Sequence, residues 1–323
     1  MAYAKSTYSP DEVESCDCPL CDNNDFALVH VERESLQVVQ CGVCDLIYVN
    51  PRLKNPSDNY RGEDQCTAHE TATMVFEKKI PHHREQCYRY ELDKIKKLNP
   101  TGKLLDIGSH CGHFLNIAEE YGYEVTGLEP STPLSEIARK YYNLNIVTDE
   151  LDKAAFKEKS FDVVTLIDVF EHITDPKKML NDISPVLKDD GIICIKVPNG
   201  NYNILKLKLA GLIGHKEKYD LFDSYEHVVH YSKKTIYKMA KACGFKVVSI
   251  GVPIPIHTPN WPKYVGYSLD YRMPFALDWK RIIIREFFYL MGNLENLLGL
   301  PVHFGPDLLF ILKKEKKSFT PKE

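Results

Sequence analysis

The stretch LLDIGSHCGHFL, residues 104–115, has the pattern of a buried strand that turns through glycines into a helix. Backbone N–H groups at the start of such a helix attract polar or anionic ligands, and glycine lets a ligand approach closely. The glycines, Gly108 and Gly112, are spaced GxxxG, whereas a dinucleotide-binding loop needs GxGxxG. This spacing disfavours a dehydrogenase. A tight turn that binds no ligand is the alternative.

Short apolar runs alternate with amphipathic segments on both sides of this stretch. Such alternation predicts an α/β fold with a doubly wound, mostly parallel sheet. Strands are expected at residues 103–108, 123–130, 145–149, 161–169, 191–199, 245–251 and 307–314. Helices are expected at residues 113–122, 133–143, 176–188 and 232–244. Two acidic residues stand at the ends of expected strands: Glu129, where a ribose would present its hydroxyls, and Asp149, where an adenine amino group would lie.

Three segments are expected along the chain. Residues 1–60 contain the closely spaced cysteines and end in a stretch rich in Pro and Asn, which marks a linker. Residues 61–100 carry apolar residues at helical spacing and predict a helical connector with a break near Pro81. Residues 101–323 hold the strand–helix alternation and predict the main domain.

Two cysteine pairs, Cys18–Cys21 and Cys41–Cys44, have the CxxC form and are separated by nineteen residues. Four thiolates at this spacing suit a tetrahedral Zn²⁺ ion in a small zinc ribbon. Four protein ligands leave no open coordination position, so a structural role is expected. A redox pair or free thiols are the alternatives, but a redox CxxC should open a helix within a βαβ unit. Cys16 could compete with Cys18 as a ligand.

The overall composition is ordinary for a globular protein and predicts a cytoplasmic location. The net charge is −4 and the pI is about 6.3, so no basic field is present to hold nucleic acid or an anionic membrane. No apolar run reaches the ~18 residues of a transmembrane helix, and no secretory signal pattern is present. Ten cysteines without an export signal favour thiols or metal ligands over disulfides. A nucleic-acid partner and membrane attachment are not expected.

Several segments in order resemble the class I S-adenosylmethionine-dependent methyltransferases. They are LLDIGSHCGHFL, VTGLEPS, FDVVTLIDVFEHITDP, LKDDGIICIKVPN and GFKVVSIG, together with the final strand. The resemblance implies a seven-stranded sheet and S-adenosylmethionine as the methyl donor. The residues it implies for binding this cofactor are Asp106, Gly108, Ser109, Gly112, Glu129, Asp149 and Asp168. The family usually has a further glycine where His110 stands, and a positive φ there would strain a histidine.

The stretch SYEHVVHYS, residues 224–232, places two histidines and a glutamate between a loop and a helix. With the cysteine pairs, it resembles a zinc-containing subgroup that includes sugar C-methyltransferases and carries a similar E-H-x-x-Y/F-x-S motif. The resemblance implies that His227 is a general base, and its intrinsic pKa near neutrality suits removal of an acceptor proton. Tyr225 or Glu226 would orient or assist it. A helix-capping loop with surface histidines is the alternative.

The expected acceptor is a small molecule, most simply a sugar or sugar nucleotide. Its recognition is expected in two insertions, at residues 200–223 and 253–306, because loops at the C-terminal ends of strands border the cofactor. Part of the second insertion, residues 276–299, is amphipathic and is expected in the core or in a homodimer interface. Whether oxygen or carbon is methylated stays open.

The stretch DVFEH offers a second candidate site. Its residues Asp168, Glu171 and His172 are similar to a motif of quinone-biosynthesis O-methyltransferases that use a divalent metal. Without a metal, His172 is expected as a second active-site histidine. Two further functions stay open: that of an rRNA methyltransferase whose ribbon contacts RNA, and that of a non-catalytic protein that senses S-adenosylmethionine.

Overall fold

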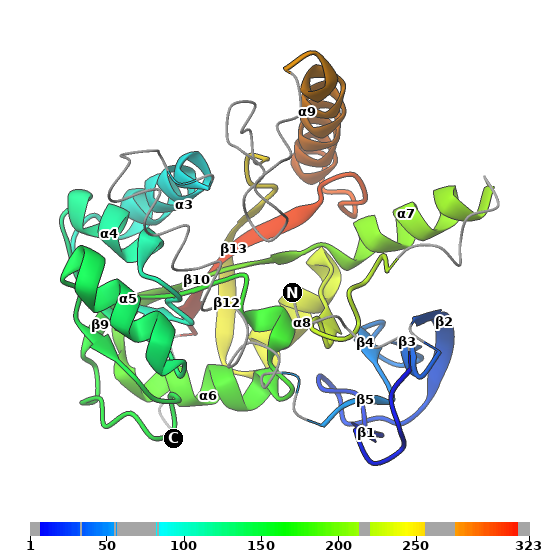
Figure 1. Ribbon diagram of the computed structural model, residues 1–323, viewed down its shortest axis with the longest axis horizontal. Helices are drawn as coiled ribbons and strands as arrows, with labels where there is room; N and C mark the ends of the chain where they lie inside the picture. Colours follow the sequence, from blue (N-terminus) through cyan, green and yellow to red (C-terminus); the bar gives the residue numbers. More distant parts are fainter. Residues whose placement is uncertain are drawn as a thin grey trace, which may run out of the picture.

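A seven-stranded sheet forms the centre of the structure, a computed structural model (Figure 1). The residues described are 7–32, 34–54, 56, 82, 84–212, 220–255 and 275–315, with backbone alone for 275–282. The strands in spatial order are β12 (Phe245–Gly251), β13 (Asp307–Lys314), β10 (Leu187–Pro198), β9 (Phe161–Ile167), β6 (Gly102–Ile107), β7 (Tyr123–Leu128) and β8 (Ile146–Val147). Strand β13 runs antiparallel to both neighbours, and the other pairs are parallel. The predicted doubly wound, mostly parallel sheet is confirmed.

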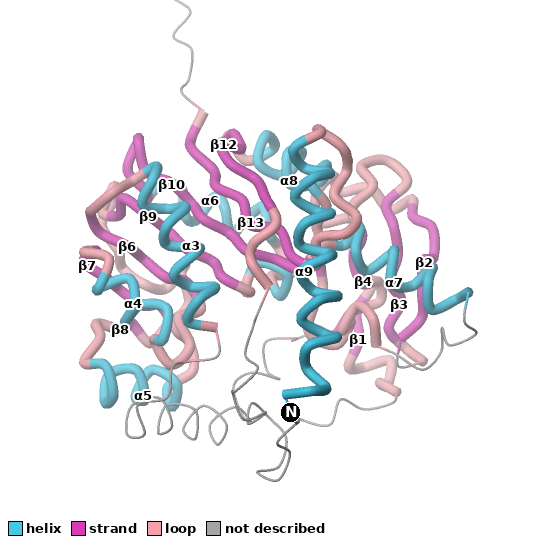
Figure 2. The backbone as a smooth tube through the Cα atoms, turned by 90° about the horizontal axis from the view of Figure 1, so that it is seen from above, coloured by secondary structure: helices cyan, strands magenta, loops and turns pink. Residues whose placement is uncertain are grey.

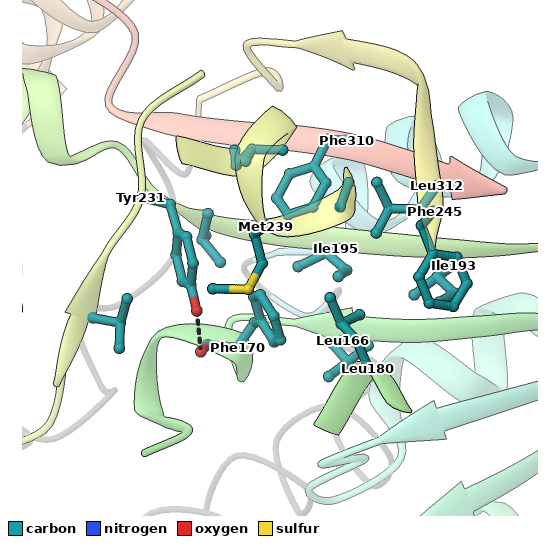
Figure 3. Close-up of a cluster of buried hydrophobic side chains, with 14 of the residues drawn as sticks. Leu166, Phe170, Leu180, Ile193, Ile195, Tyr231, Met239, Phe245, Phe310 and Leu312 are labelled. Atoms are coloured by element: carbon teal, nitrogen blue, oxygen red, sulfur yellow. Dashed lines mark hydrogen bonds between the residues drawn. The ribbon is translucent and has the colours of Figure 1, made fainter. Parts of the chain in front are cut away.

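Helices cover both faces of this sheet. On one face pack α3 (Glu85–Leu98), α4 (His113–Glu120) and α5 (Thr132–Tyr142), and on the other α6 (Pro176–Val186) and α8 (Lys233–Ala242). Figure 3 shows the second face, where Phe170 and Met239 lie against apolar side chains of the strands. The central strands β9 and β10 are apolar runs, as expected of strands that are buried on both faces.

One expected strand boundary differs from the structure, and the structure adds detail to the insertions. The strand expected at 191–199 begins earlier, at Leu187, because Leu187 pairs with Phe161 ahead of a β-bulge. The insertions contain long helices, α7 (Gly200–Leu212) and α9 (Phe275–Leu297). The break expected near Pro81 lies outside the described residues. None of the helices in the described ranges is long and apolar enough to span a bilayer.

The N-terminal segment forms two small sheets. Strands β1 (Val13–Glu14) and β5 (Arg52–Leu53) pair in one. The other has four strands in the order β11 (Val229–His230), β4 (Ile47–Val49), β3 (Leu36–Cys41) and β2 (Phe26–Glu32). We call the latter the ribbon sheet. Its strand β11 belongs to the SYEHVVHYS stretch, so the ribbon sheet contains a strand from far along the chain.

The ribbon sheet also packs against the main domain. Figures 1 and 2 show β2, β3 and β4 beside α7, and Val38 and Ile47 of the ribbon sheet share an apolar cluster with Leu207 of α7. Charged contacts add to this packing: Lys177 of α6 donates to Asp22 at 2.6 Å, and Lys238 of α8 donates to the Cys44 carbonyl at 2.8 Å. The cysteine-bearing segment and the sheet therefore form one continuous body.

The glycine turn after β6 can be tested by substitution. Gly112 has φ +80°, and a Cβ there would lie 2.4 Å from Leu144 Cδ1. Gly112→Ala should lower the free energy of unfolding by about 1–3 kcal/mol through strain and crowding. Gly122 is the matched control, since its φ is +91° but nothing lies within 4 Å of a Cβ. Urea unfolding should show a smaller loss for Gly122→Ala, and equal losses would contradict the crowding argument.

Candidate active site

The turn after β6 is held against the end of β7. The backbone N–H groups of Gly108 and Ser109 donate to the Leu128 carbonyl at 2.8 and 3.2 Å. Gly108 has φ +73°, and a Cβ there would lie 2.6 Å from Val169 Cγ2. Glycine is therefore required for both the conformation and the packing at this position.

Glu129 is fixed directly beside this turn. Its carboxylate accepts from the N–H of His110 and from the N–H of Ser131, each at 2.9 Å. Burial raises the pKa of Glu129, and the two N–H donors oppose that shift. His110 has φ +50°, in the left-handed region, as its place in the glycine turn requires. Histidine is among the residues that tolerate this region better than most.

Two buried hydroxyls flank Glu129 without partners. The Oγ atoms of Ser109 and Ser131 are buried and make no hydrogen bond within the described part of the chain. Buried polar atoms are normally paired, and an exception calls for a missing partner such as a ligand or water. The ends of β6 and β7 thus present a fixed carboxylate and two unpaired hydroxyls to the same region.

Two other predicted cofactor residues have partners inside the protein. Asp106 is 4% exposed and accepts from the Thr165 hydroxyl at 2.6 Å. Burial raises the pKa of Asp106 to about 7. Asp149, just after β8, accepts from the N–H of Glu150 at 2.8 Å. Asp106 therefore supports the turn from within, and Asp149 caps the next turn of the chain.

Asp168 follows β9 with φ +55° and lies between two cations. Lys196 of β10 donates to its carboxylate at 2.6 Å, and Arg84 pairs with its other oxygen. Burial alone would raise the pKa of Asp168, but Arg84 and Lys196 hold it well below its usual range. The sequence analysis missed both cations. Lys196 is the one charged residue in the apolar run IICIKVP, and this pattern could have indicated a buried cation with an acidic partner. The sequence around Arg84 has no such pattern.

Glu91 of α3 lies close to the same cations. It is 0% exposed, and neither carboxylate oxygen has a hydrogen-bond partner among the described residues. Burial raises the pKa of Glu91 to about 8, although Lys196 and Arg84 oppose the shift. An unpaired buried carboxylate is costly when ionised, so the protonated form is favoured in the folded protein.

Three predicted site residues gather beside Asp168. The rings of His172 and His227 lie 4.8 Å apart, and Glu171 Oε1 lies 3.9 Å from His172 Nε2. One ligand-type atom from each of the three lies within 4.8 Å of the others. Burial lowers the pKa of both histidines, and for His227 the neighbouring His172 and His230 lower it further.

Backbone contacts bring the two histidines together from distant segments. The Val228 N–H donates to the Glu171 carbonyl at 2.9 Å, next to both rings. Tyr231 stacks on Phe170 with ring centroids 5.0 Å apart, and its hydroxyl donates to the Phe170 carbonyl (Figure 3). The loop after β9 and the SYEHVVHYS stretch are therefore packed as one unit.

The other residues of that stretch face different surroundings. The Tyr225 ring packs with Leu36, Val49 and Leu53 of the N-terminal segment. The Glu226 carbonyl lies 3.0 Å from His172 Nδ1, so its backbone contacts the histidine pair. His230 is 2% exposed in the ribbon sheet. Assistance by the Tyr225 or Glu226 side chain stays a prediction.

The four predicted zinc ligands lie together. Cys18 and Cys44 have Sγ atoms 3.4 Å apart, and Cys21 and Cys41 have theirs 3.5 Å apart. All four Sγ atoms lie within 4.8 Å of one another. Tetrahedral zinc with Zn–S bonds of about 2.3 Å places its sulfurs roughly 3.8 Å apart, so the residues fit this ion.

A family model described as a methyltransferase domain matches residues 80–250. The chain belongs to this methyltransferase family. Strand β13 lies between β12 and β10 and runs antiparallel to both. This order of strands agrees with the family assignment. The protein is an S-adenosylmethionine-dependent methyltransferase. The donor set at the ends of β6 and β7 fits the cofactor, because a fixed carboxylate and buried hydroxyls suit a ribose.

Relatives of this methyltransferase match over part of its length. The uncharacterized protein MJ1123 of Methanocaldococcus jannaschii is 27% identical over 50% of this chain and 73% of its own. A ubiquinone biosynthesis O-methyltransferase of Coxiella burnetii is 23% identical over 46% of this chain and 64% of its own. One chain in a complex of the Haloferax volcanii Trm112 methyltransferase activator with a methyltransferase superposes with TM-score 0.50. That chain is 15% identical, over 79% of this chain and 98% of its own, and shows the fold alone.

The buried carboxylate of Glu91 predicts a pH-dependent stability. Its pKa rises from an ordinary 4.5 to about 8 on folding, so its favourable contribution is present below pH 4.5 and is lost as the pH rises toward 8. The stability of Glu91→Gln relative to wild type should therefore increase between pH 4.5 and pH 8, by at least about 1 kcal/mol. Chemical unfolding at several pH values measures this difference. The exposed Glu119→Gln is the control, and a flat difference for Glu91→Gln would contradict the argument.

Proposed function

We propose that this methyltransferase acts on a hydroxyl or an activated carbon of a small molecule, with His227 as the general base. The observation that carries the proposal is the contact of His227 with His172 beside Asp168, at the end of β9. In a parallel α/β sheet, ligands bind beyond the carboxyl ends of the strands. The histidine pair therefore lies at the edge where the glycine turn and Glu129 also lie.

The histidine pair has the protonation state that a base requires. Burial, His172 and His230 hold the pKa of His227 well below its usual range, so the imidazole is neutral at pH 7 and has a ring nitrogen that can accept a proton, at the cost of a lower basicity. The bound cofactor supplies a methyl group on a sulfonium. His227 would take the proton that leaves the acceptor hydroxyl or carbon as the acceptor forms its new bond to the methyl carbon. The contact of His172 with the Glu226 carbonyl would hold the pair in place.

The charged residues beside the pair suit the amino-acid end of the cofactor. That end carries one positive and one negative charge. Asp168 presents a carboxylate, and Arg84 presents a guanidinium next to it. They form a mutual ion pair, so both groups lie at the same place, and together they would suit a zwitterionic ligand.

A sugar or sugar nucleotide is the acceptor we favour. Lys206 on α7 donates to the Leu221 carbonyl at 3.2 Å, beside the turn that carries His227, so a cation lies next to the expected acceptor side. A cation there suits a phosphorylated or nucleotide-linked sugar. The net charge of −4 fits a discrete pocket better than an RNA surface.

We also propose that Cys18, Cys21, Cys41 and Cys44 bind a structural Zn²⁺ ion. Their sulfur separations fit tetrahedral zinc, and four protein ligands leave no position for a substrate. The ion would then stabilise the N-terminal segment without contacting the reacting atoms.

A phenolic acceptor, as in quinone synthesis, is the second candidate. It is favoured by the relative named as a ubiquinone biosynthesis O-methyltransferase and by the cluster of Glu171, His172 and His227, whose ligand-type atoms could hold a divalent metal. In that case the metal would lower the pKa of the acceptor hydroxyl, and His227 would be a ligand rather than a base.

Transfer of label from methyl-labelled S-adenosylmethionine into a cell extract tests the proposal. The extract is fractionated into small acidic metabolites, lipids, RNA and protein. We expect label among the small acidic metabolites, reduced about 100-fold or more by His227→Ala because general-base catalysis is lost. The affinity for the cofactor should stay within about twofold. His303→Ala, at an exposed histidine paired with Glu295, is the control.

Different outcomes would assign the protein differently. Label in RNA would contradict a small-molecule acceptor, and label in the lipid fraction would favour the phenolic candidate. Full transfer by His227→Ala would exclude this residue as the base. Cofactor binding without transfer to any fraction would favour a sensor of S-adenosylmethionine.

A further inference from the structure

Glu32, at the end of β2, is a buried carboxylate outside the histidine cluster. It is 3% exposed and lies in the ribbon sheet. Its Oε1 accepts from the Phe222 N–H at 2.8 Å, and its Oε2 accepts from the Ser224 N–H at 3.0 Å and from the Ser224 hydroxyl at 2.7 Å. All three donors belong to one short loop, 190 residues or more along the chain.

This loop leads directly to His227. Within it, the N–H groups of Glu226 and His227 both donate to the Asp223 carbonyl at 2.9 Å. The loop is therefore a tight turn whose start is bound to Glu32 and whose end carries His227. Fixing residues 222–224 consequently fixes where the turn places His227.

The other side of His227 is anchored to the same sheet. The Val49 N–H donates to the Val228 carbonyl at 3.0 Å, and Val229 pairs with Tyr48 in the β4–β11 ladder. The ribbon sheet thus holds the chain both before and after His227. One anchor is a strand pairing, and the other is a single side chain, Glu32.

We propose that Glu32 is a positioning residue for methyl transfer, which sets the place of His227 through the turn at residues 222–227. The proposal rests on His227 as the base. It assigns the N-terminal segment a role in the active site: its sheet is the support on which the acceptor-side loop is built. It also accounts for the buried glutamate at the end of β2.

A carboxylate is the group that this loop requires. Both oxygens accept, and three donors converge on them. A glutamine has the same shape but presents an NH₂ group to one set of donors, which leaves buried N–H groups unsatisfied. Glu32→Gln therefore changes the hydrogen bonding and keeps the volume. Glu34→Gln, at an exposed position of the same hairpin, is the matched control.

The experiment combines amide hydrogen exchange with methyl transfer, using full-length protein and the extract fraction that wild type labels. Glu32→Gln should increase exchange at Phe222 and Ser224 about tenfold or more and should reduce kcat about 10–100-fold. The affinity for the cofactor and the slow amide exchange of the paired residues in β2 and β3 should stay unchanged. This result would distinguish a misplaced His227 from a protein that fails to fold. Ser224→Ala removes one of the three bonds and should give intermediate effects, so it tests the proposal even if Glu32→Gln fails to fold.

Each result has a definite meaning. Unchanged kcat in Glu32→Gln with a loosened loop would overturn the positioning role, as would unchanged exchange at the loop. If Glu34→Gln changed loop exchange and kcat as much as Glu32→Gln does, the effects could not be assigned to the hydrogen bonds of Glu32. Wild-type protein that labels no fraction, while Glu32→Gln still loosens the loop, would refute the proposed function and leave Glu32 as an anchor alone.

Discussion

The pairing of β11 with β4 is the contact on which the rest of the candidate active site depends. It joins the SYEHVVHYS stretch to the N-terminal segment, with Val229 opposite Tyr48 and His230 opposite Ile47. On its other side the same stretch contacts the loop after β9, through the Val228 N–H and the Glu171 carbonyl. His227 is therefore held between the ribbon sheet and the main sheet, and neither part alone defines its position.

In this arrangement the cysteine-bearing segment has a structural role at the candidate site. The backbone groups of the SYEHVVHYS stretch need hydrogen-bond partners wherever they are buried. The ribbon sheet supplies those partners through β4 and Glu32. The cysteine-bearing turns beside the ribbon sheet are in turn tied to α6 and α8 by Lys177 and Lys238. A bound zinc ion would stiffen this support without touching the reacting atoms.

The sequence predicts the parts of the site that follow from local pattern. The apolar run at Phe161–Ile167 locates a buried strand, and the residue after it, Asp168, then falls at the active edge. The same reasoning places Glu129 and the glycine turn. Contacts between distant segments could not be predicted. A strand of two residues, Val229–His230, has no sequence pattern that identifies Ile47–Val49 as its partner. The hydrogen bonds of Glu32 and the ion pair of Arg84 with Asp168 could not be predicted for the same reason. The individual roles of the predicted site residues stay predictions.

Removal of the proposed zinc ion from the four cysteines tests most directly whether the N-terminal segment supports the candidate active site. The measurement compares wild-type protein before and after treatment with a zinc chelator under reducing conditions, following methyl transfer and amide exchange at residues 228–231. We expect the metal-free protein to bind S-adenosylmethionine within about twofold of its original affinity, to exchange these amides faster, and to lose methyl transfer. Full methyl transfer by metal-free protein with all four thiols reduced would contradict the dependence of His227 on the ribbon sheet.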